Sequence, residues 1–423
     1  MNNNTTYKIS VILPMHNRQE YISASLTSVL EQTLKEVEIV CIDDGSTDCT
    51  VHIVKEFICK HSNIKLIEQE HKGVGVARNI GIAQALGEFI FFMDSDDFFY
   101  SNEALKTLYK TAKSHKAYVC GGGMCKFDNG KIIKKYYGWL KDMAFEKSGW
   151  VNYEDYQFQS GFTRFIYQRE FLLKHNLKFP NYVRYQDPPF FVNTMIAAEK
   201  FYAVSEIIYT YRVGHKRLSM DKKMVVDYGR GIRDVLEIAL KNDFSKLYEN
   251  VKFSLEGALK PYLYKLIYQE DIEAIELAHE LNILMSHEEK KMFAFGNQAK
   301  EYIESIKKEA DDFLKTIDAF EAVYIFGAGK VGMRTAEFIK KSGCNTLKEY
   351  IVTNISDNLP IINGIKVRAL ETKREEINNT IVLIALFKSN ISEVIDALKE
   401  RGLNNYMIIH PEKMEFWNIL IDV

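Results

Sequence analysis

The chain has 423 residues, which is enough for two or three domains of about 150 residues each. Its net charge of -2 gives no electrostatic reason to expect nucleic acid as a partner. The opening residues MNNNTTYKIS lack a basic-then-apolar leader, and no apolar run approaches the ~20 residues of a membrane span. We therefore expect a cytoplasmic protein. Its six cysteines form no CxxC pair and are interpreted as reduced thiols.

The first hundred residues alternate short apolar runs with stretches of helical spacing. Strands are predicted at 8–13, 37–42, 64–67 and 89–93. Helices are predicted at 20–32, at about 51–58, and from the loop HKGVGVARN through Leu86. This βαβαβαβ order predicts a mostly parallel sheet with right-handed crossovers.

The fourth strand is bounded by acids in the stretch EFIFFMDSDD, and it delivers Asp94, Ser95, Asp96 and Asp97 to one place. In open α/β sheets, ligands bind beyond the carboxyl ends of the strands. Two carboxylates at i and i+2 can share a hard divalent cation, Mg²⁺ or Mn²⁺, which would help a diphosphate to leave. The alternative is a polar turn before a helix.

Two other loops should reach the same edge of the sheet. The first strand is followed by Pro14, His16, Asn17 and Glu20, and the second ends in Asp43 and Asp44. A carboxylate such as Asp44 can accept a hydrogen bond from a uracil N–H. Arg78, on the helix before the fourth strand, can meet a phosphate or fix the acid cluster. The alternative for the acid pair is a turn with a helix cap.

Taken together, SVILPMHN, VCIDDGSTD and GVGVARNIGIAQALGEFIFFMDSDD resemble family 2 glycosyltransferases of the GT-A fold, over residues 8 to 100. The resemblance implies an inverting transfer of a sugar from a nucleotide donor, with UDP as the expected nucleotide. It implies a metal motif at Asp94 and Asp96, with Asp96 facing the diphosphate and Ser95 between them. His16 stands where such sequences often have an aromatic residue. The implied nucleotide-sugar site comprises Pro14, His16, Asn17, Glu20, Asp43, Asp44, Arg78, Asp94 and Ser95.

Asp187, in RYQDPPFF, is the predicted general base. An inverting transfer needs one group that takes the proton of the acceptor hydroxyl. The resemblance places this role on the acid of a Glu-Asp pair that opens a helix, and here the pair is Gln186-Asp187. The alternative is an N-cap before Pro188, with a helix to Glu199. The two roles are compatible, because capping can fix the carboxylate while one oxygen faces the acceptor.

The first domain is expected to span 1–223, with its last strand at 207–212. The loop VGHKRLSM follows that strand, and some GT-A enzymes place a metal-binding histidine at such a position. His215 is therefore a candidate third metal ligand; the alternative is a solvated basic loop. Residues 224–315 show helical spacing and are interpreted as a connector or lid, and as a candidate dimer surface.

Residues 316–423 start a second α/β pattern, which predicts a small Rossmann-like domain. Its expected strands are 323–326, 350–352, 381–386 and 406–409. Gly327, Gly329 and Gly332 form a GxGxxG motif between a strand and a helix, which makes NAD(P) a candidate cofactor. The ribose-binding acid is missing, because the second strand ends at Asn354 and Glu349 comes too early. The alternative is a packing or oligomerisation domain, or one that holds another nucleotide.

These features favour a metal-dependent inverting glycosyltransferase of fold class α/β, with a GT-A domain, a helical connector and a Rossmann-like domain. The expected partners are a nucleotide-sugar donor and an acceptor in a growing surface glycan, either a capsule or lipopolysaccharide chain or its lipid-linked form. Association would then be peripheral, at the inner face of the plasma membrane. One alternative is a bifunctional enzyme whose second domain performs redox or epimerase chemistry on the sugar nucleotide. Another is a non-catalytic scaffold for glycan assembly.

Overall fold

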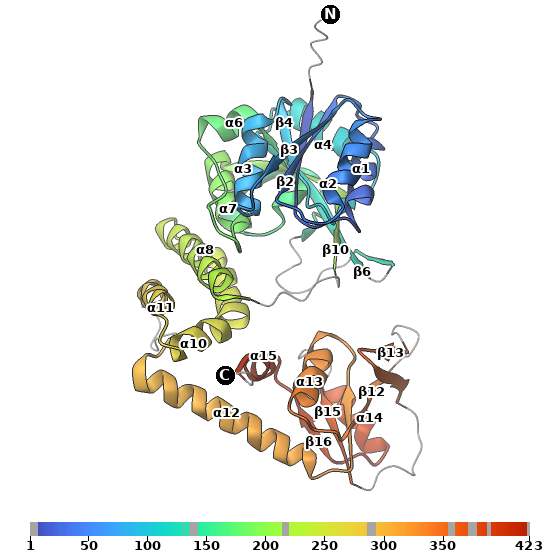
Figure 1. Ribbon diagram of the computed structural model, residues 1–423, viewed down its shortest axis with the longest axis vertical. Coiled ribbons are helices and arrows are strands. Elements are labelled where there is room, and N and C mark those ends of the chain that lie inside the picture. The colour runs from blue at the N-terminus through green and yellow to red at the C-terminus, as the bar shows by residue number, and fades with distance from the viewer. Residues whose placement is uncertain are drawn as a thin grey trace, which may run out of the picture. The chain divides into compact units, whose positions relative to one another are not determined.

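A computed structural model describes residues 7–128, 130–134, 143–213, 220–285, 293–353, 360–370, 379–386 and 391–420. The chain folds into two compact units, Met1–Ser254 and Leu255–Val423. The boundary between them lies inside the segment 224–315 that was predicted as a connector. Helices α8 (Lys222–Lys241) and α9 (Ser245–Ser254) fold with the first unit, and the helices after them fold with the second (Figure 1).

The first unit is built on a mixed sheet in the order β3-β2-β1-β4-β9-β6-β10-β5, with β7 paired to β6 and β8 paired to β10. The strands are β1 (Ile9–Met15), β2 (Val37–Asp44), β3 (Ile64–Gln69), β4 (Phe89–Phe92), β5 (Phe98–Phe99), β6 (Val119–Asp128), β7 (Lys131–Ile133), β8 (Gly149–Asn152), β9 (Phe165–Gln168) and β10 (Lys200–Arg212). The helices before α8 are α1 (Ile22–Leu30), α2 (Thr50–Ile58), α3 (Val74–Gln84), α4 (Ala104–His115), α5 (Tyr153–Tyr156), η2 (Phe162–Arg164), α6 (Arg169–Lys174) and α7 (Asp187–Ala198).

The predicted parallel half is confirmed, because β3, β2, β1 and β4 pair in parallel. Every residue of β1, β2 and β4 is buried, as expected for strands covered on both faces. Helices α1 and α2 lie on one face of this half and α3 lies on the other (Figure 1). Right-handed crossovers produce this arrangement, because the connection from β3 to β4 runs back across β2 and β1.

Proline 14 lies inside β1 and does not end the strand as predicted. It pairs with Ile42 of β2. On its other side β4 has already ended, since the last pair of that ladder joins Ile12 to Phe92. Proline has no N–H to donate, and it is tolerated at a position where the strand on one side has ended and no hydrogen bond is needed there.

The second half of this sheet could not be predicted from local pattern. Strand β6 follows α4, and the predicted strand 207–212 is the end of the longer β10. These two strands pair in parallel, and β9 lies antiparallel between β4 and β6. Strands β6 and β7 pair as an antiparallel hairpin with Gly130, at φ 81°, in its turn.

The second unit has a smaller sheet in the order β13-β14-β12-β11-β15-β16, parallel except for β13. Its strands are β11 (Ala322–Phe326), β12 (Leu347–Val352), β13 (Ile361–Ile362), β14 (Ile365–Ala369), β15 (Thr380–Ile384) and β16 (Tyr406–Ile408). Its helices are η3 (Leu255–Leu259), α10 (Lys260–Tyr268), α11 (Ile272–Leu284), α12 (Gly296–Asp318), α13 (Lys330–Lys341), α14 (Ile391–Glu400) and α15 (Pro411–Leu420). Sequence analysis missed β13, β14 and α15.

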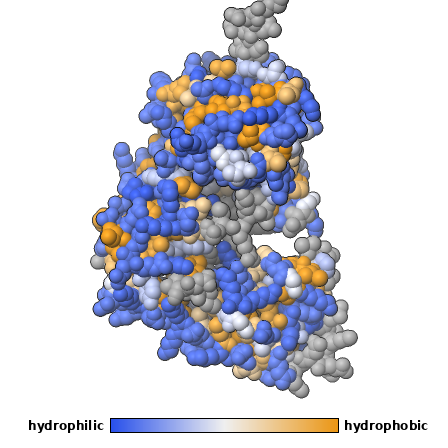
Figure 2. Space-filling model, viewed as in Figure 1, coloured by the Kyte–Doolittle hydropathy of each residue, from blue (hydrophilic) through white to orange (hydrophobic). Residues whose placement is uncertain are grey.

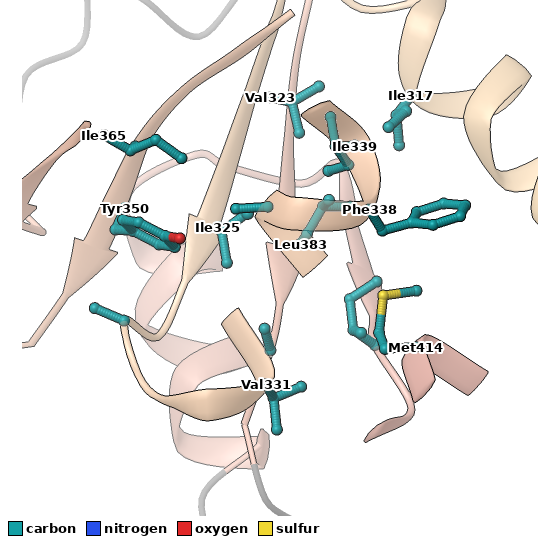
Figure 3. Packing of buried hydrophobic residues seen from close by; sticks show 14 of the residues in the cluster. Ile317, Val323, Ile325, Val331, Phe338, Ile339, Tyr350, Ile365, Leu383 and Met414 are labelled. Carbon is teal, nitrogen blue, oxygen red and sulfur yellow. The ribbon is translucent and has the colours of Figure 1, made fainter. Parts of the chain in front are cut away.

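The core of the second unit forms on both faces of this sheet. On one face, side chains from α12, α13 and α15 pack on the strands, among them Ile317, Phe338 and Met414 (Figure 3). On the other face, Val394 and Leu398 of α14 pack on Val382 and Ile384 of β15. Both faces of the parallel strands are therefore covered, which is the usual condition for a parallel sheet.

Polar side chains cover most of the surface visible in Figure 2, with smaller apolar patches between them. Within the described ranges, no helix is both long enough and apolar enough to cross a membrane.

Candidate active site

The acidic turn after β4 is held by the end of β10. The Tyr209 hydroxyl donates to Asp97 Oδ2 at 2.8 Å and accepts from the Asp94 N–H at 3.0 Å. The Arg212 N–H donates to Asp97 Oδ1 at 2.7 Å. Asp97 is 1% exposed, so its carboxylate serves as an internal tie of the turn. This arrangement leaves Asp94 and Asp96 as the acids that face outward.

Burial raises the pKa of Asp97 well above its usual range, and the charges of Asp94 and Asp96 add to the effect. Three carboxylates within one four-residue turn repel each other. Positive charge brought to Asp94 and Asp96 would relieve that repulsion, so the turn is suited electrostatically to a cation.

Arg78 lies beneath this turn and contacts Asp94. Its Nη2 is 2.6 Å from Asp94 Oδ1, and its guanidinium lies over the rings of Phe162 and Phe179, at 4.7 and 5.2 Å. Arg78 is 4% exposed, and its Nε and Nη1 have no hydrogen-bond partner among the described residues. Buried donors without partners are costly, so this guanidinium is suited to receive an anionic or hydroxyl oxygen.

Asp96 is contacted by two arginines that sequence analysis did not select. Arg18 Nε lies 3.4 Å from Asp96 Oδ2, and Arg212 Nε donates to the Asp96 carbonyl at 2.8 Å. The Arg212 guanidinium also lies over the rings of Tyr21, Phe98 and Phe127. Ser95 is buried behind the turn, where its carbonyl accepts from the Ser25 hydroxyl at 3.0 Å.

The two acids that end β2 differ in how their oxygens are used. Asp44 accepts from Gln69 Nε2, Lys72 N and Gly73 N at 2.6 to 2.9 Å, and His71 Nδ1 lies 2.9 Å from it. Its carboxylate therefore organises the loop between β3 and α3. Asp43 is also buried, at 3% exposed, but only its Oδ2 is bonded, by Ser46 N–H at 3.1 Å.

The second oxygen of Asp43, Oδ1, is buried without a hydrogen-bond partner among the described residues. A buried carboxylate oxygen left without a donor is unfavourable. The structure thus separates two residues that the sequence could only treat as a pair: Asp44 fixes a loop, and Asp43 has one oxygen without a partner among the described residues.

The loop after β1 fastens the loop after β2. Asn17, at φ 52°, accepts from Thr47 N–H at 2.8 Å and Asp48 N–H at 3.3 Å. His16 Nδ1 lies 2.8 Å from the Asp44 carbonyl oxygen, and its ring is 4.4 Å from that of His71. Glu20 is exposed at the outer end of this loop. Pro14 is buried in β1 with its neighbours.

Asp187 is the first residue of α7, and Gln186 is the N-cap, so Asp187 lies one position later than the predicted cap. Burial raises its pKa above the usual value, the charge of Arg78 opposes part of that rise, and Asp94 adds to it. Asp187 is therefore near enough to Arg78 and Asp94 for their charges to affect its pKa. A carboxylate with a raised pKa is a stronger base than an ordinary aspartate.

The outward acids fit a divalent cation as a partial ligand set. Side-chain exposure is 32% for Asp94 and 15% for Asp96, and Asp94 Oδ2 has no partner among the described residues. In the part of the chain that the structure describes, no cluster of three or more His, Cys, Asp or Glu residues could hold a metal by itself. Further ligands would come from outside the described residues, from a diphosphate or from water. The predicted ligand His215 lies outside the described residues.

The glycines of the second unit are explained largely by its own packing. Gly327 has φ 104°, a conformation that favours glycine. A Cβ on Gly332 would lie 1.9 Å from the Gly327 carbonyl oxygen. Only glycine at position 332 therefore allows the first turn of α13 to pack against Gly327. A Cβ on Gly329 would meet nothing within 4 Å. The NAD(P) loop at Gly327, Gly329 and Gly332 stays a prediction, because a tight turn and close helix packing are also what the first and third glycines of such a motif provide.

Sequence analysis missed the residues that support the acidic turn from a distance. Arg18 follows directly on the selected Asn17, so its loop was identified but its contact was not. Tyr209 and Arg212 lie in the predicted strand 207–212, more than 110 residues after the turn. Only the register of β10 shows that this strand ends beside the turn, and no local signal gives that register.

The fold and the site together define a nucleotide-sugar transferase of the GT-A type, in which parallel strands end in acidic loops. Comparison with known proteins agrees. The model of the Glycosyl transferase family 2 matches residues 10–175. Glycosyltransferase GlyG of Streptococcus pneumoniae serotype 4 is 30% identical over 214 residues, 48% of this chain and 70% of GlyG. The chain belongs to the family 2 glycosyltransferases.

Two further relatives bear on substrates. The poly(ribitol-phosphate) beta-glucosyltransferase of Bacillus spizizenii is 31% identical over 213 residues, 49% of this chain. This chain spans about a third of that enzyme's length, 32%. Residues 1–349 of S. aureus TarS, solved in complex with UDP-GlcNAc, are similar with a TM-score of 0.52 and 25% identity. That similarity covers 66% of this chain and 80% of the TarS chain.

Proposed function

We propose that the first unit transfers a sugar, with inversion, from a UDP-sugar to a hydroxyl of a surface glycan, with a divalent cation bound at Asp94 and Asp96. The observation that carries the proposal is that Asp43 Oδ1 and Arg78 Nε and Nη1, at the edge that holds the acidic turn, are buried without partners among the described residues. A carboxylate oxygen that can accept hydrogen bonds and guanidinium nitrogens that can donate them therefore lie at one edge of the sheet. This combination suits a ligand that carries both donors and acceptors.

The nucleotide would bind at the ends of β1 and β2. Asp43 Oδ1 would accept the N–H of a uracil ring, since uracil offers a donor between two carbonyl groups. His16 and His71 would supply ring faces beside it. TarS 1–349 binds UDP-GlcNAc, which supports UDP as the nucleotide and makes UDP-GlcNAc the first donor to test.

A divalent cation held by Asp94 and Asp96 would neutralise charge on the diphosphate. Arg78 fixes Asp94 by its 2.6 Å contact, and its Nε and Nη1, which have no partner among the described residues, would bond the donor. Arg18 and Arg212 hold Asp96 in place. Because these contacts come from three separate segments of the chain, the acids would be oriented before any ligand binds.

Asp187 would accept the proton of the acceptor hydroxyl as that oxygen attacks the anomeric carbon. Its raised pKa suits this role, and its position at the start of α7 fixes the carboxylate. The product would leave with inverted configuration, since a single displacement needs one base and no covalent intermediate. The similarity to a poly(ribitol-phosphate) beta-glucosyltransferase supports a glycan of the cell surface as the acceptor.

Nucleotide binding tests this proposal without knowledge of the acceptor. Thermal unfolding would be measured with UDP, GDP, CMP and dTDP, each with and without Mn²⁺, for the wild type and Asp96→Ala. A ligand at 100 times its Kd should add about 2.7 kcal/mol to the stability of the folded state. We expect stabilisation by UDP that requires both Mn²⁺ and Asp96. A folded wild type that responds to none of the nucleotides would refute the proposal and favour a scaffold role.

A further inference from the structure

The segment before Asp187 lies along one face of α8. The Val183 N–H donates to Asp227 Oδ2 at 2.9 Å, and the Tyr182 hydroxyl donates to Asp234 Oδ2 at 2.8 Å. Positions 227, 231 and 234 are spaced i, i+4 and i+7, so they share one side of the helix. Residues on this side of α8 thus contact the segment at more than one point.

Asp227 is suited to hold a backbone group firmly. It is 1% exposed, and Lys223 Nζ and Arg230 Nη1 lie 3.0 and 3.3 Å from its carboxylate. A buried carboxylate that contacts two cationic side chains is held in place by them, whereas one left alone would be costly to bury. The bond to Val183 therefore has a rigid acceptor.

Tyr185 is held in an unusual conformation against the same face. Its φ is 62°, which is uncommon for a bulky residue and costs energy unless the surroundings impose it. Its ring stacks on Tyr228 with centroids 4.7 Å apart. A Cβ on Gly231 would lie 2.6 Å from the Tyr185 carbonyl oxygen, so only glycine at 231 permits this approach.

The other end of the segment is fastened to α3. Asn79 Nδ2 donates to the Phe179 carbonyl at 2.8 Å, and the Phe179 N–H donates to Asn79 Oδ1 at 2.9 Å. Residues 179 to 186 are therefore pinned at both ends, and α7 begins from the second end. The position of the Asp187 carboxylate follows from these contacts.

We propose that α8 is the positioning element for the general base, and that Asp227, Gly231 and Asp234 orient Asp187 through residues 182 to 186. The inference rests on the proposed function, since it needs Asp187 to act as the base. None of the three is assigned a contact with donor, metal or acceptor. They are positioning residues, and α8 begins well after residue 175, where the family match ends.

The consequence for catalysis is specific. A misplacement of about 1 Å in a catalytic group can cost about 100-fold in rate. Loss of the α8 contacts should therefore lower kcat while the donor site, built on β1, β2 and β4, stays intact. The donor KM and the UDP affinity should remain unchanged.

Gly231→Ala and Asp227→Ala test this inference, with Asp227→Asn as the conservative variant. Gly231→Ala favours the helix through its higher propensity but pushes Tyr185 away, so a loss of activity would not reflect a weaker helix. Asp221→Ala is the matched control, because Asp221 only caps α8, by accepting from Met224 N–H at 2.8 Å. Donor turnover, UDP affinity and backbone hydrogen exchange of residues 182–187 would be measured on the full chain.

We expect Gly231→Ala and Asp227→Ala to lower kcat at least tenfold, with donor KM and the Kd of UDP within about twofold of wild type. Exchange of residues 182–187 should become at least ~10-fold faster, since the Val183 N–H loses its acceptor or its alignment. Asp227→Asn, which keeps an oxygen at the same place, should recover most of the rate. Asp221→Ala should lower Tm and keep kcat.

Unchanged kcat in folded Gly231→Ala and Asp227→Ala would overturn the positioning role and leave the proposed function standing. An equal loss of UDP affinity would also overturn it, because the effect would then be a general distortion of the site. A folded wild type that releases UDP from no UDP-sugar, with Mn²⁺ present, would instead defeat the proposed function and this inference with it.

Discussion

The two sheets of this chain share a strand order but differ at the edge where ligands bind. When the parallel strands of each unit are counted along the chain, both sheets have the order third, second, first, fourth. These strands are β3-β2-β1-β4 in the first unit and β14-β12-β11-β15 in the second. Strands β2 and β4 lead into buried and half-buried acids. Among the described residues, β11, β12, β15 and β16 are followed by Gly327, Thr353, Ala385 and Ile409.

The difference shows that topology supplies a place and side chains decide its use. At the first edge, Asp43 Oδ1 and two nitrogens of Arg78 are buried without partners, so the fold carries a cost that a ligand would relieve. At the second edge, two of the three motif glycines are required by the path of the backbone itself. The sequence motif at the first edge is therefore stronger evidence for a ligand site than the glycine motif at the second edge.

The largest expected effect is the loss of the outward acid in the first unit. Asp96→Ala should lower Mn²⁺-dependent release of UDP from a UDP-sugar by about a thousandfold, since a cation at a diphosphate contributes several kcal/mol. The measurement is the initial rate at saturating donor. Asp155→Ala, which removes an exposed acid of α5, is the control and should behave as wild type. Equal rates for all three would contradict the assigned cation site.

The second largest effect is expected at Asp43, whose buried Oδ1 at the end of β2 has no partner among the described residues. Asp43→Asn should raise the Kd of UDP about 10- to 100-fold, because a hydrogen bond to a charged acceptor contributes about 1.5–3 kcal/mol. Calorimetric titration of UDP measures it. Asp48→Asn is the matched control from the same loop, since the Asp48 carboxylate already accepts from Thr50 N–H at the start of α2. If Asp48→Asn weakened UDP as much as Asp43→Asn, the special role of Asp43 would be lost.

Two glycines of the second unit can be compared to test which positions of its motif are needed for packing. Gly332→Ala should destabilise that unit by about 1–3 kcal/mol, since its Cβ would overlap the Gly327 carbonyl. Gly329→Ala, in open space, should change stability by no more than about 0.5 kcal/mol. Thermal unfolding of the full chain measures both. Loss of UDP-sugar turnover in Gly329→Ala would show that the second unit takes part in the transfer.

The smallest effect is a shift in pH dependence. Because burial raises the pKa of Asp187, the rate should fall as pH drops through a value above the ordinary 3.8 of an aspartate, where the base becomes protonated. Arg78 opposes that rise, so Arg78→Gln should move the acid limb of the kcat profile to higher pH. An acid limb that moves to lower pH in this variant would contradict the sign of the coupling.

Much of the first unit follows from the sequence, for a physical reason. Buried strands such as Phe89–Phe92 and the acids that follow them are local features, so their order along the chain already predicts a shared edge. What the sequence could not supply is long-range. The supports of the acidic turn, Tyr209 and Arg212, depend on the register of β10, and the division of labour between Asp43 and Asp44 depends on a loop 25 to 29 residues away.

The second unit shows the same limit. Its strands at 322–326, 347–352, 380–384 and 406–408 were predicted to within a few residues, because each contains a continuous run of at least three apolar residues. Strand β14 was missed, since Ile365 and Val367 alternate with charged residues in a short stretch. The glycine motif suggested a ligand, but the Cβ clash at Gly332 shows a packing requirement that is invisible in sequence.

The central claim is that Asp187 removes the acceptor proton in a UDP-sugar transfer by the first unit. The most direct measurement is UDP release by wild type and Asp187→Asn, with Mn²⁺ and a panel of UDP-sugars led by UDP-GlcNAc, alongside UDP affinity for both. We predict turnover of at least one donor by the wild type, and a rate about 10²–10⁴-fold lower in Asp187→Asn with unchanged UDP affinity. Near-equal rates in the two proteins would contradict the account.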